Sequence, residues 1–268
     1  MSLFRRRVAE LTGVAEDQLQ RLGGGDLSEA LLVQRPDGRK LVAKSGMVAA
    51  EAAMLRSMAE AGVPVPLVEG EYESVLLLDH VANDNVFSPR AWGDFGAQLR
   101  RLHRRTDEQY GWPVDFAIGL VEIGNLQTRD WPGFWAELRL VAVAATLDRP
   151  WRDRVAVAAQ NARERLPAHP VPAHLHGDLW TGNVLVQDGR LAALIDPACY
   201  FGDPEVDLAM LTLFAEPPPE FWGGYGALEP GWQERRPLYQ LFPALLHMRL
   251  FGPVYGGMVD RLLTAAGA

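Results

Sequence analysis

Hydrophobic and polar positions in the first eighty residues follow the pattern of a small α/β unit. Apolar stretches at 30–33 and 41–44 flank a Pro-Asp-Gly turn signal at 36–38, which predicts a β-hairpin. Across 48–60 the apolar residues recur at helical spacing, so we expect a helix there. The apolar run at 75–78 then predicts a buried strand. The first unit therefore combines a hairpin, a helix and one further strand.

The remainder of the chain has a mainly helical pattern. Ser88 and Pro89 predict a helix start, because a serine hydroxyl can cap the helix and proline suits its first turn. This helix is expected to end near Arg105, with its large apolar residues on one side. Further helices are expected at 132–145, 151–166, 205–214 and 238–249.

The sharpest chemical signal is the string HGDLWTGN at 176–183. It has the spacing H-x-D-x-x-x-x-N that is found in phosphoryl-transfer catalytic loops. Asp178 could accept the proton of an attacking hydroxyl, and Asn183 could offer its amide oxygen to Mg²⁺. A short pattern of this kind also arises by accident, so its surroundings must decide.

The residues that follow this string predict a β-hairpin. Apolar strands at 184–186 and 191–195 flank an Asp-Gly dipeptide, which is a strong signal for a tight turn. If the strands pair around that turn, Asn183 and Asp196 meet at the open end of the hairpin. Oxygen ligands of this kind suit Mg²⁺. The alternative is that both residues only terminate their strands, as Asn and Asp often do.

The small unit contains a matching arrangement for phosphate groups. Gly23, Gly24 and Gly25 precede the first hairpin strand, and glycines allow phosphates to approach the backbone closely. Pairing of the hairpin strands places Lys44 near these glycines, where its charge could neutralise phosphate. Glu51 lies on the following helix and could hold Lys44 in place. Alone, Lys44 would more often be an exposed charge at a strand end.

Composition limits the class of protein and of partner. The 268 residues are 48% hydrophobic and 22% charged with a formal net charge of −8, as in a globular protein without a broad basic surface. We therefore expect neither nucleic acid nor a membrane as partner, and the oligomeric state stays open. One cysteine excludes an internal disulfide framework. Without a long apolar run or a signal-like start, a cytoplasmic location is expected. Pattern and length together suggest an α+β chain with a β-rich lobe at 1–82 and a mainly helical lobe at 83–268.

Several longer strings resemble the fructosamine kinase (ketosamine-3-kinase) family, within the aminoglycoside/choline-kinase-like group. The central ones are HGDLWTGNVLV and the following LIDPACYFGDPEVDLAML. Supporting strings are GGGDLSEALLV, LVAKSG, EAAMLRSM and AIGLVEIGNLQTRDWPGFWAELRL. The resemblance extends from about Leu22 to Leu250. HGD followed by a later Asp is shared across the wider group, whereas HGDLW-x-GN with the middle string marks the ketosamine branch.

This resemblance implies a bilobal, protein-kinase-like fold that transfers the γ-phosphoryl group of ATP to a small hydroxylated substrate. Asp178 would then be the catalytic base, and Asn183 and Asp196 would hold Mg²⁺. Lys44 would contact the α- and β-phosphates of ATP, with Glu51 orienting it.

The resemblance also implies how each substrate is held. Asp79, His80 and Val81 would form the hinge that offers backbone groups to adenine. The acceptor would be the C3 hydroxyl of a ketosamine, a fructosamine- or ribulosamine-type glycation adduct that is either small or protein-bound. Phosphorylation destabilises such an adduct and releases the amine, so the activity resembles a deglycation.

Residues of the catalytic string and of the middle string are assigned to the acceptor. They are Trp180, whose ring could stack on a sugar, together with His176, Asn125 and Trp131. Two alternatives remain open: a phosphotransferase for an aminoglycoside, choline or homoserine-type alcohol, and a catalytically silent pseudokinase that only binds nucleotide. An aminoglycoside is a polycation and calls for a densely acidic cleft, whereas a ketosamine needs stacking surfaces and fewer carboxylates.

Overall fold

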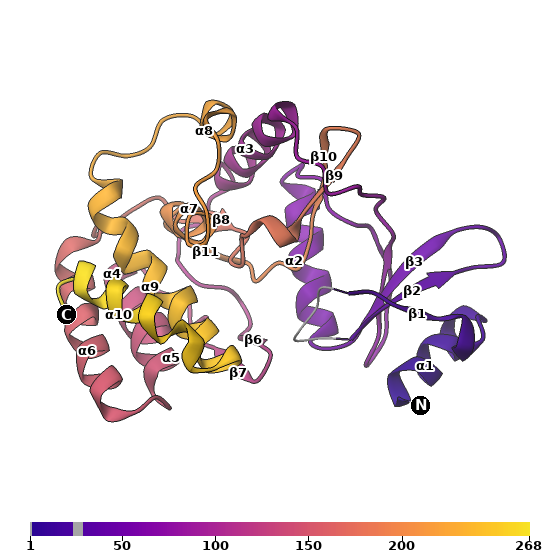
Figure 1. Cartoon of the computed structure of the whole chain (residues 1–268), viewed down its shortest axis with the longest axis horizontal. Coiled ribbons are helices and arrows are strands. Elements are labelled where there is room, and N and C mark those ends of the chain that lie inside the picture. The colour runs from indigo at the N-terminus through magenta and orange to yellow at the C-terminus, as the bar shows by residue number, and fades with distance from the viewer. Residues whose placement is uncertain (1, 24–28) are drawn as a thin grey trace.

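The computed structural model describes residues 2–23 and 29–268, which form a sheet lobe and a helical lobe (Figure 1). The sheet lobe, from α1 to β5, is built on an antiparallel five-stranded sheet in the order β1-β2-β3-β5-β4. Its strands are β1 (Gln20–Arg21), β2 (Ala30–Gln34), β3 (Lys40–Lys44), β4 (Val68–Glu71) and β5 (Leu76–Asp79).

Alternation of side chains along the strands supplies both faces of this sheet with apolar residues. Leu41 and Ala43 on β3 point to one face, whereas Val42 between them points to the other. Helix α1 (Leu3–Thr12), followed by a short 3₁₀ turn (Glu16–Gln18), packs on the first face, and α2 (Val48–Glu60) packs on the second. The sheet is therefore buried between two helices.

The helical lobe, from α3 to α10, surrounds one large core (Figure 1). Its longer helices are α3 (Pro89–His103), α6 (Arg149–Arg165), α9 (Trp232–Phe251) and α10 (Gly256–Ala265). Its shorter helices are α4 (Trp131–Phe134), α5 (Ala142–Ala144), α7 (Glu205–Leu211) and α8 (Pro219–Tyr225), with a π-helical segment (Trp135–Val141) and 3₁₀ turns (Thr181–Asn183 and Pro253–Tyr255). Three two-stranded ribbons complete it: β6 (Phe116–Ile118) with β7 (Val121–Ile123), β8 (Ala173–Leu175) with β11 (Tyr200–Gly202), and β9 (Val184–Gln187) with β10 (Arg190–Leu194).

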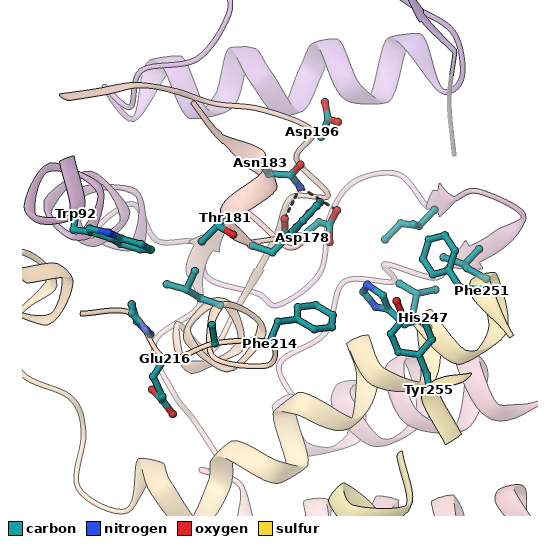
Figure 2. A pocket seen from close by; sticks show the side chains of 17 residues that line it. Trp92, Asp178, Thr181, Asn183, Asp196, Phe214, Glu216, His247, Phe251 and Tyr255 are labelled. Carbon is teal, nitrogen blue, oxygen red and sulfur yellow. Dashed lines mark hydrogen bonds between the residues drawn. The ribbon is translucent and has the colours of Figure 1, made fainter. Parts of the chain in front are cut away.

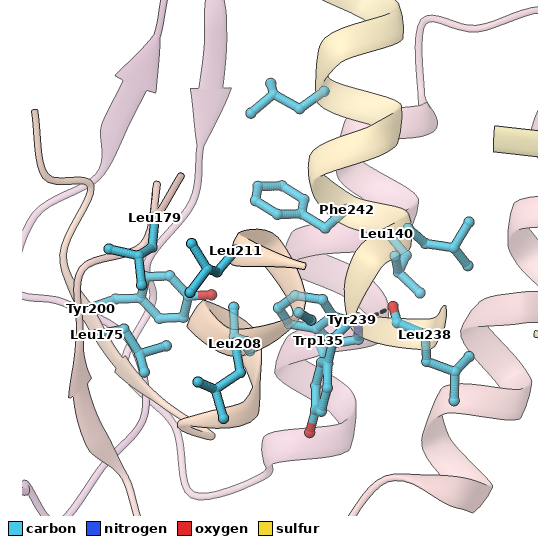
Figure 3. Close-up of a cluster of buried hydrophobic side chains, with 14 of the residues drawn as sticks. Trp135, Leu140, Leu175, Leu179, Tyr200, Leu208, Leu211, Leu238, Tyr239 and Phe242 are labelled. Carbon is cyan, nitrogen blue, oxygen red and sulfur yellow. Dashed lines mark hydrogen bonds between the residues drawn. The ribbon is translucent and has the colours of Figure 1, made fainter. Parts of the chain in front are cut away.

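Aromatic and aliphatic side chains from α7, α9 and the π-helical segment form the centre of this core (Figure 3). Leu175 and Leu179 join it from the two sides of the 176–178 turn, and both are fully buried. Trp135 donates its indole N–H to the Leu238 carbonyl oxygen at 3.2 Å, which ties the π-helical segment to α9. The core therefore holds the chain on both sides of Asp178.

Helix α2 belongs to both lobes. Its residues Ala52 and Leu55 pack under the sheet, whereas Met54 and Met58 are fully buried in the core of the helical lobe. At its C-terminal end, Glu60 accepts two hydrogen bonds from the guanidinium group of Arg105, each at 3.1 Å. One helix thus connects the sheet to the helical lobe along its length.

The structure confirms the predicted hairpin of β2 and β3, the helix at 48–60 and the helix start at Ser88. The Ser88 hydroxyl accepts the Ala91 N–H at 3.1 Å, as an N-cap should. The predicted helix at 132–145 is present from α4 to α5 but includes the π-helical segment. The sequence prediction missed α1, α8, α10, β4 and the ribbons β6–β7 and β8–β11, whose three-residue strands are too short for a visible period. No helix in the described part of the chain combines the length and the apolar character that crossing a membrane requires.

Candidate active site

The β9–β10 hairpin brings Asn183 and Asp196 to the same place. Asp188 and Gly189 both have positive φ, 52° and 69°, which is the backbone of a two-residue type I′ turn. The strands pair around this turn, and the Ile195 N–H donates to the Asn183 carbonyl oxygen at 3.0 Å. Asn183 and Asp196 therefore lie close to each other at the open end of the hairpin (Figure 2).

Asp178 lies directly beside this pair. The Asn183 Nδ2 donates to the Asp178 carbonyl oxygen at 2.8 Å and to its Oδ2 at 3.2 Å (Figure 2). Burial raises the pKa of the Asp178 carboxyl group to about 6, and the hydrogen bond from Asn183 opposes this only in part. A carboxyl group with this pKa is ionised at neutral pH and is a stronger proton acceptor than an exposed aspartate.

The backbone before Asp178 is held by a second carboxylate. Asp207 on α7 is fully buried and accepts the His176 N–H at 2.7 Å and the Gly177 N–H at 2.9 Å. Gly177 has a φ of +83°, and a Cβ there would lie 2.0 Å from the Ala198 carbonyl oxygen. Only glycine fits this turn, so backbone contacts on both sides fix the position of Asp178.

Lys44 connects the sheet lobe to the hairpin. Its Nζ donates to Glu51 Oε1 on α2 and, at 2.6 Å, to Asp196 Oδ1. Burial works to lower the pKa of Lys44, but the carboxylates of Glu51 and Asp196 outweigh it and raise that pKa. Lys44 is therefore a charged group held between α2 and the hairpin.

The donor set at Asn183 and Asp196 fits a hard divalent cation. Because Asn183 Nδ2 donates to Asp178, its Oδ1 is left as an acceptor on the other side of the amide group. The Asp196 side chain is 43% exposed, so one of its oxygens can reach a ligand while the other contacts Lys44. An amide oxygen with a carboxylate suits Mg²⁺, which also retains water and phosphate oxygens as ligands.

A cavity of about 550 Å³ opens in front of these residues (Figure 2). Asp178, Asn183 and Asp196 lie at one wall. The remaining lining comes from α3, β6, residues 180–181, the end of α7 with the segment that follows it, the end of α9 and the 3₁₀ turn after it. It is rich in aromatic groups: Trp92, Trp180, Phe214, His247, Phe251 and Tyr255. Among the described residues that line it, Glu216 is the one carboxylate besides Asp178 and Asp196, and this group contacts Arg236. The cavity therefore offers stacking surfaces and little free negative charge.

A smaller cavity of about 210 Å³ adjoins the same carboxylates. It lies between Lys44, the loop at 45–47, the turn of the β6–β7 ribbon and residues 196–198. Ile118 of this ribbon lines both cavities. The ribbon thus separates the two spaces beside Asp178 and Asp196.

The structure brings most of the predicted site residues together, but three of the residues assigned to the acceptor do not line the cavities. His176 is fully buried: its Nε2 contacts the Ile195 carbonyl oxygen at 3.0 Å and its Nδ1 accepts the Asp178 N–H. Trp131 is fully buried and donates its indole N–H to Tyr239 at 2.9 Å. Asn125 is 2% exposed and accepts from Arg139 at 2.7 Å. Each of these three side chains has its hydrogen-bond partners inside the protein, and none of the three lines either cavity.

The predicted nucleotide residues are only partly described. Gly23 follows β1, whereas Gly24 and Gly25 lie outside the described residues. In the predicted hinge, the Asp79 N–H donates to the Leu67 carbonyl oxygen at 2.9 Å, and the His80 N–H donates to that of Lys40 at 3.1 Å. Within the part of the chain that the structure describes, the Val81 N–H makes no hydrogen bond.

Sequence reasoning missed the aromatic wall at Trp92, Phe214, His247, Phe251 and Tyr255. These residues come from helices and loops far apart in the chain, and nothing in their local pattern separates a cavity wall from a core face. His247 gave one weak signal, because a polar ring stands in an otherwise apolar stretch of α9. Their common location appears only in the folded chain.

The sheet lobe and the helical lobe meet at Lys44, Asn183 and two carboxylates, Asp178 and Asp196. This arrangement defines a protein-kinase-like fold. The family model described as fructosamine kinase matches residues 4–266, and the chain belongs to this family.

Individual relatives agree with this assignment. A "Probable ketoamine kinase" of Thermus thermophilus is 36% identical over 276 aligned positions, with 99% of each chain covered. Another "Probable ketoamine kinase", of Synechocystis, is 37% identical over 180 positions, which cover 65% of this chain and 61% of that relative, less than two thirds of its length. A crystal structure from Thermobifida fusca, named as a candidate fructosamine-3-kinase, has a TM-score of 0.87 and 33% identity, with 99% of this chain and 98% of that chain covered.

Proposed function

We propose that this protein is an ATP-dependent kinase that phosphorylates the C3 hydroxyl of a ketosamine and so promotes deglycation. The observation that carries the proposal is the convergence of Asp178, Asn183, Asp196 and Lys44 at one end of a cavity with aromatic walls. Membership of the fructosamine kinase family supports the same reaction and acceptor.

In this proposal each side chain has one role in the transfer. Asp178 accepts the proton of the acceptor hydroxyl as its oxygen attacks the γ-phosphorus. Lys44, oriented by Glu51, neutralises charge on the α- and β-phosphates. Asn183 and Asp196 would hold Mg²⁺, which would supply positive charge to neutralise the phosphate groups. Most of the rate enhancement then comes from positioning and from charge neutralisation.

The nucleotide is proposed to bind between an N-terminal lobe at 1–82 and a C-terminal lobe at 83–268. Of the three hinge residues, Asp79 and His80 use their N–H groups within the sheet lobe. We therefore propose the Val81 N–H as the backbone donor for adenine, and the role of the glycines at 23–25 toward the phosphates stays a prediction.

The cavity favours a ketosamine over a polycationic aminoglycoside. A polycation would need several free carboxylates, yet Glu216 already contacts Arg236. Aromatic faces instead suit the C–H surfaces of a sugar. His247 adds a polar contact: its Nδ1 lies 2.8 Å from the Pro243 carbonyl oxygen and must donate to it, which leaves Nε2 of the neutral ring as an acceptor for a sugar hydroxyl.

A coupled kinase assay over a panel of acceptors tests this function. The panel contains a fructosamine, a ribulosamine, an aminoglycoside, choline and homoserine, each with MgATP. We expect turnover with the two ketosamines, and a product that carries phosphate on the C3 oxygen. Preference for another alcohol would contradict the ketosamine assignment, and no turnover with any acceptor would favour the pseudokinase alternative.

Replacing Trp180 by Ala is expected to raise the KM for the ketosamine by roughly 10-fold, since a stacking face worth about 1 to 1.5 kcal/mol is lost. The Trp180 side chain lines the cavity and is 39% exposed. The KM for ATP should stay unchanged, as measured by steady-state kinetics. Tyr72→Ala is the matched control, because Tyr72 is also 39% exposed and does not line the cavity. Equal effects of both variants would contradict the role of Trp180.

A further inference from the structure

A buried network of hydrogen bonds connects α8 and α3 to the catalytic loop. The Tyr225 hydroxyl on α8 lies 2.9 Å from His103 Nδ1 on α3, and His103 Nε2 lies 3.0 Å from Asp207 Oδ2. The side chain of His103 is 2% exposed and that of Asp207 is fully buried, and Tyr225 is 3% exposed. Because Asp207 accepts the His176 and Gly177 N–H groups, the network ends on the backbone next to Asp178.

The donor and acceptor roles in this hydrogen-bond network follow from the chemistry of its two ends, Asp207 and Tyr225. Burial alone would raise the pKa of Asp207, but the hydrogen bond from His103 and the other donors outweigh it and lower that pKa. The ionised carboxylate can only accept, so His103 Nε2 carries a proton. Burial raises the pKa of Tyr225, whose hydroxyl therefore keeps its proton and lies within hydrogen-bond distance of His103 Nδ1.

Close contact between α3 and α8 holds Tyr225 over His103. A Cβ on Gly96 would lie 2.1 Å from the Phe221 carbonyl oxygen, and a Cβ on Gly224 would lie 2.1 Å from that of Gly93. The backbones of the two helices therefore touch, which only glycines permit. Figure 1 shows α8 beside α3.

We propose that Tyr225 is a positioning residue for phosphoryl transfer, which acts through His103 and Asp207 to hold the backbone that carries Asp178. This role rests on the proposed kinase function. It extends the site to α8, which begins directly after the 214–217 segment of the cavity wall. Neither Tyr225 nor His103 lines the cavity, so neither is expected to touch a substrate.

Tyr225→Phe tests the proposal, since it removes one hydroxyl and keeps the packed ring. We expect kcat to fall by roughly 3- to 10-fold while the KM for ATP and for the ketosamine stay within about 2-fold. Amide hydrogen exchange in a 174–183 peptide should become faster, because the His176 and Gly177 N–H groups are held less firmly. Ser57→Ala is the matched control: it removes a hydroxyl that lies 3.1 Å from Nε2 of another buried histidine, His174.

The outcomes separate this inference from the proposed function. A selective loss of turnover with faster exchange in Tyr225→Phe, and neither effect in Ser57→Ala, supports the inference. A Tyr225→Phe protein that keeps either its turnover or its exchange rate unaltered overturns it, and so does an equal loss in Ser57→Ala. A wild-type protein without turnover on any ketosamine contradicts the proposed function instead, and the exchange experiment then decides the role of Tyr225 by itself.

Discussion

Replacement of Asp178 by Asn is expected to lower kcat for ketosamine phosphorylation by about 100-fold or more, the usual scale for loss of a general base. The amide has nearly the same shape and cannot accept the proton of the attacking hydroxyl. Binding of nucleotide should change little, because Asn183, Asp196 and Lys44 remain. Steady-state kinetics and calorimetric titration of MgATP measure both quantities. Near-normal turnover in this variant would remove Asp178 from the role of base.

Two further measurements serve as controls: the pH dependence of turnover in the wild-type protein and the thermal stability of the Asp178→Asn variant. Because the pKa of Asp178 in the protein without bound substrates is about 6, kcat/KM of the wild-type protein should fall as the pH drops through 6 and the carboxylate becomes protonated. The pKa of this carboxyl group is higher in the folded protein than in the unfolded chain. The free energy of unfolding is therefore lower above pH 6, where the buried carboxylate is ionised, than at acid pH. Asp178→Asn removes that buried charge and should keep or raise the midpoint of thermal unfolding at pH 8. Loss of activity with a lowered midpoint would indicate misfolding instead.

Asp196→Ala is expected to abolish the gain in nucleotide affinity that Mg²⁺ provides. The variant loses the Asp196 carboxylate beside Asn183 at the open end of the β9–β10 hairpin, and the Asn183 amide oxygen alone is a poor site for the ion. Lys44 keeps its contact with Glu51, so its buried charge remains compensated. Calorimetric titration of ATP with and without Mg²⁺ measures the difference.

The Asp196→Ala experiment is compared with a control variant and with the wild-type protein. Asp153→Ala removes an exposed carboxylate on α6, distant from the cavity, and should leave the Mg²⁺ dependence as in the wild type. An Asp196→Ala protein whose ATP affinity still rises with Mg²⁺ as the wild type's does would refute the metal assignment.

Much of the catalytic end of the site could be predicted because it is built from local structure. Asn183 and Asp196 flank one hairpin, and an Asp-Gly turn with apolar strands indicates both the pairing and its open end. Lys44 and Glu51 are seven residues apart, on a strand and on the helix that follows it. In each case the spacing along the chain constrains the spacing in the fold.

The acceptor end could not be predicted, because long-range packing decides it. Trp131 and Trp92 are both large aromatic residues at or near a helix start, yet Trp131 is in the core and Trp92 lines the cavity. What separates them is a partner for the indole N–H of Trp131, Tyr239, which lies 108 residues away. The same reason explains why His247, on α9, was not linked to the catalytic residues.

The double attachment of α2 has a consequence for control of the enzyme. In many kinases the equivalent of Glu51 is withdrawn when its helix swings outward, and activity is switched in this way. Here such a swing would pull Met54 and Met58 out of the helical lobe, at a cost of about 1.5 to 3 kcal/mol for each side chain, and would break the contact between Glu60 and Arg105. The position of the Lys44–Glu51 pair is therefore tied to the packing of both lobes. We expect the rate of turnover to depend on the amounts of substrate and protein, and less on movement of this helix.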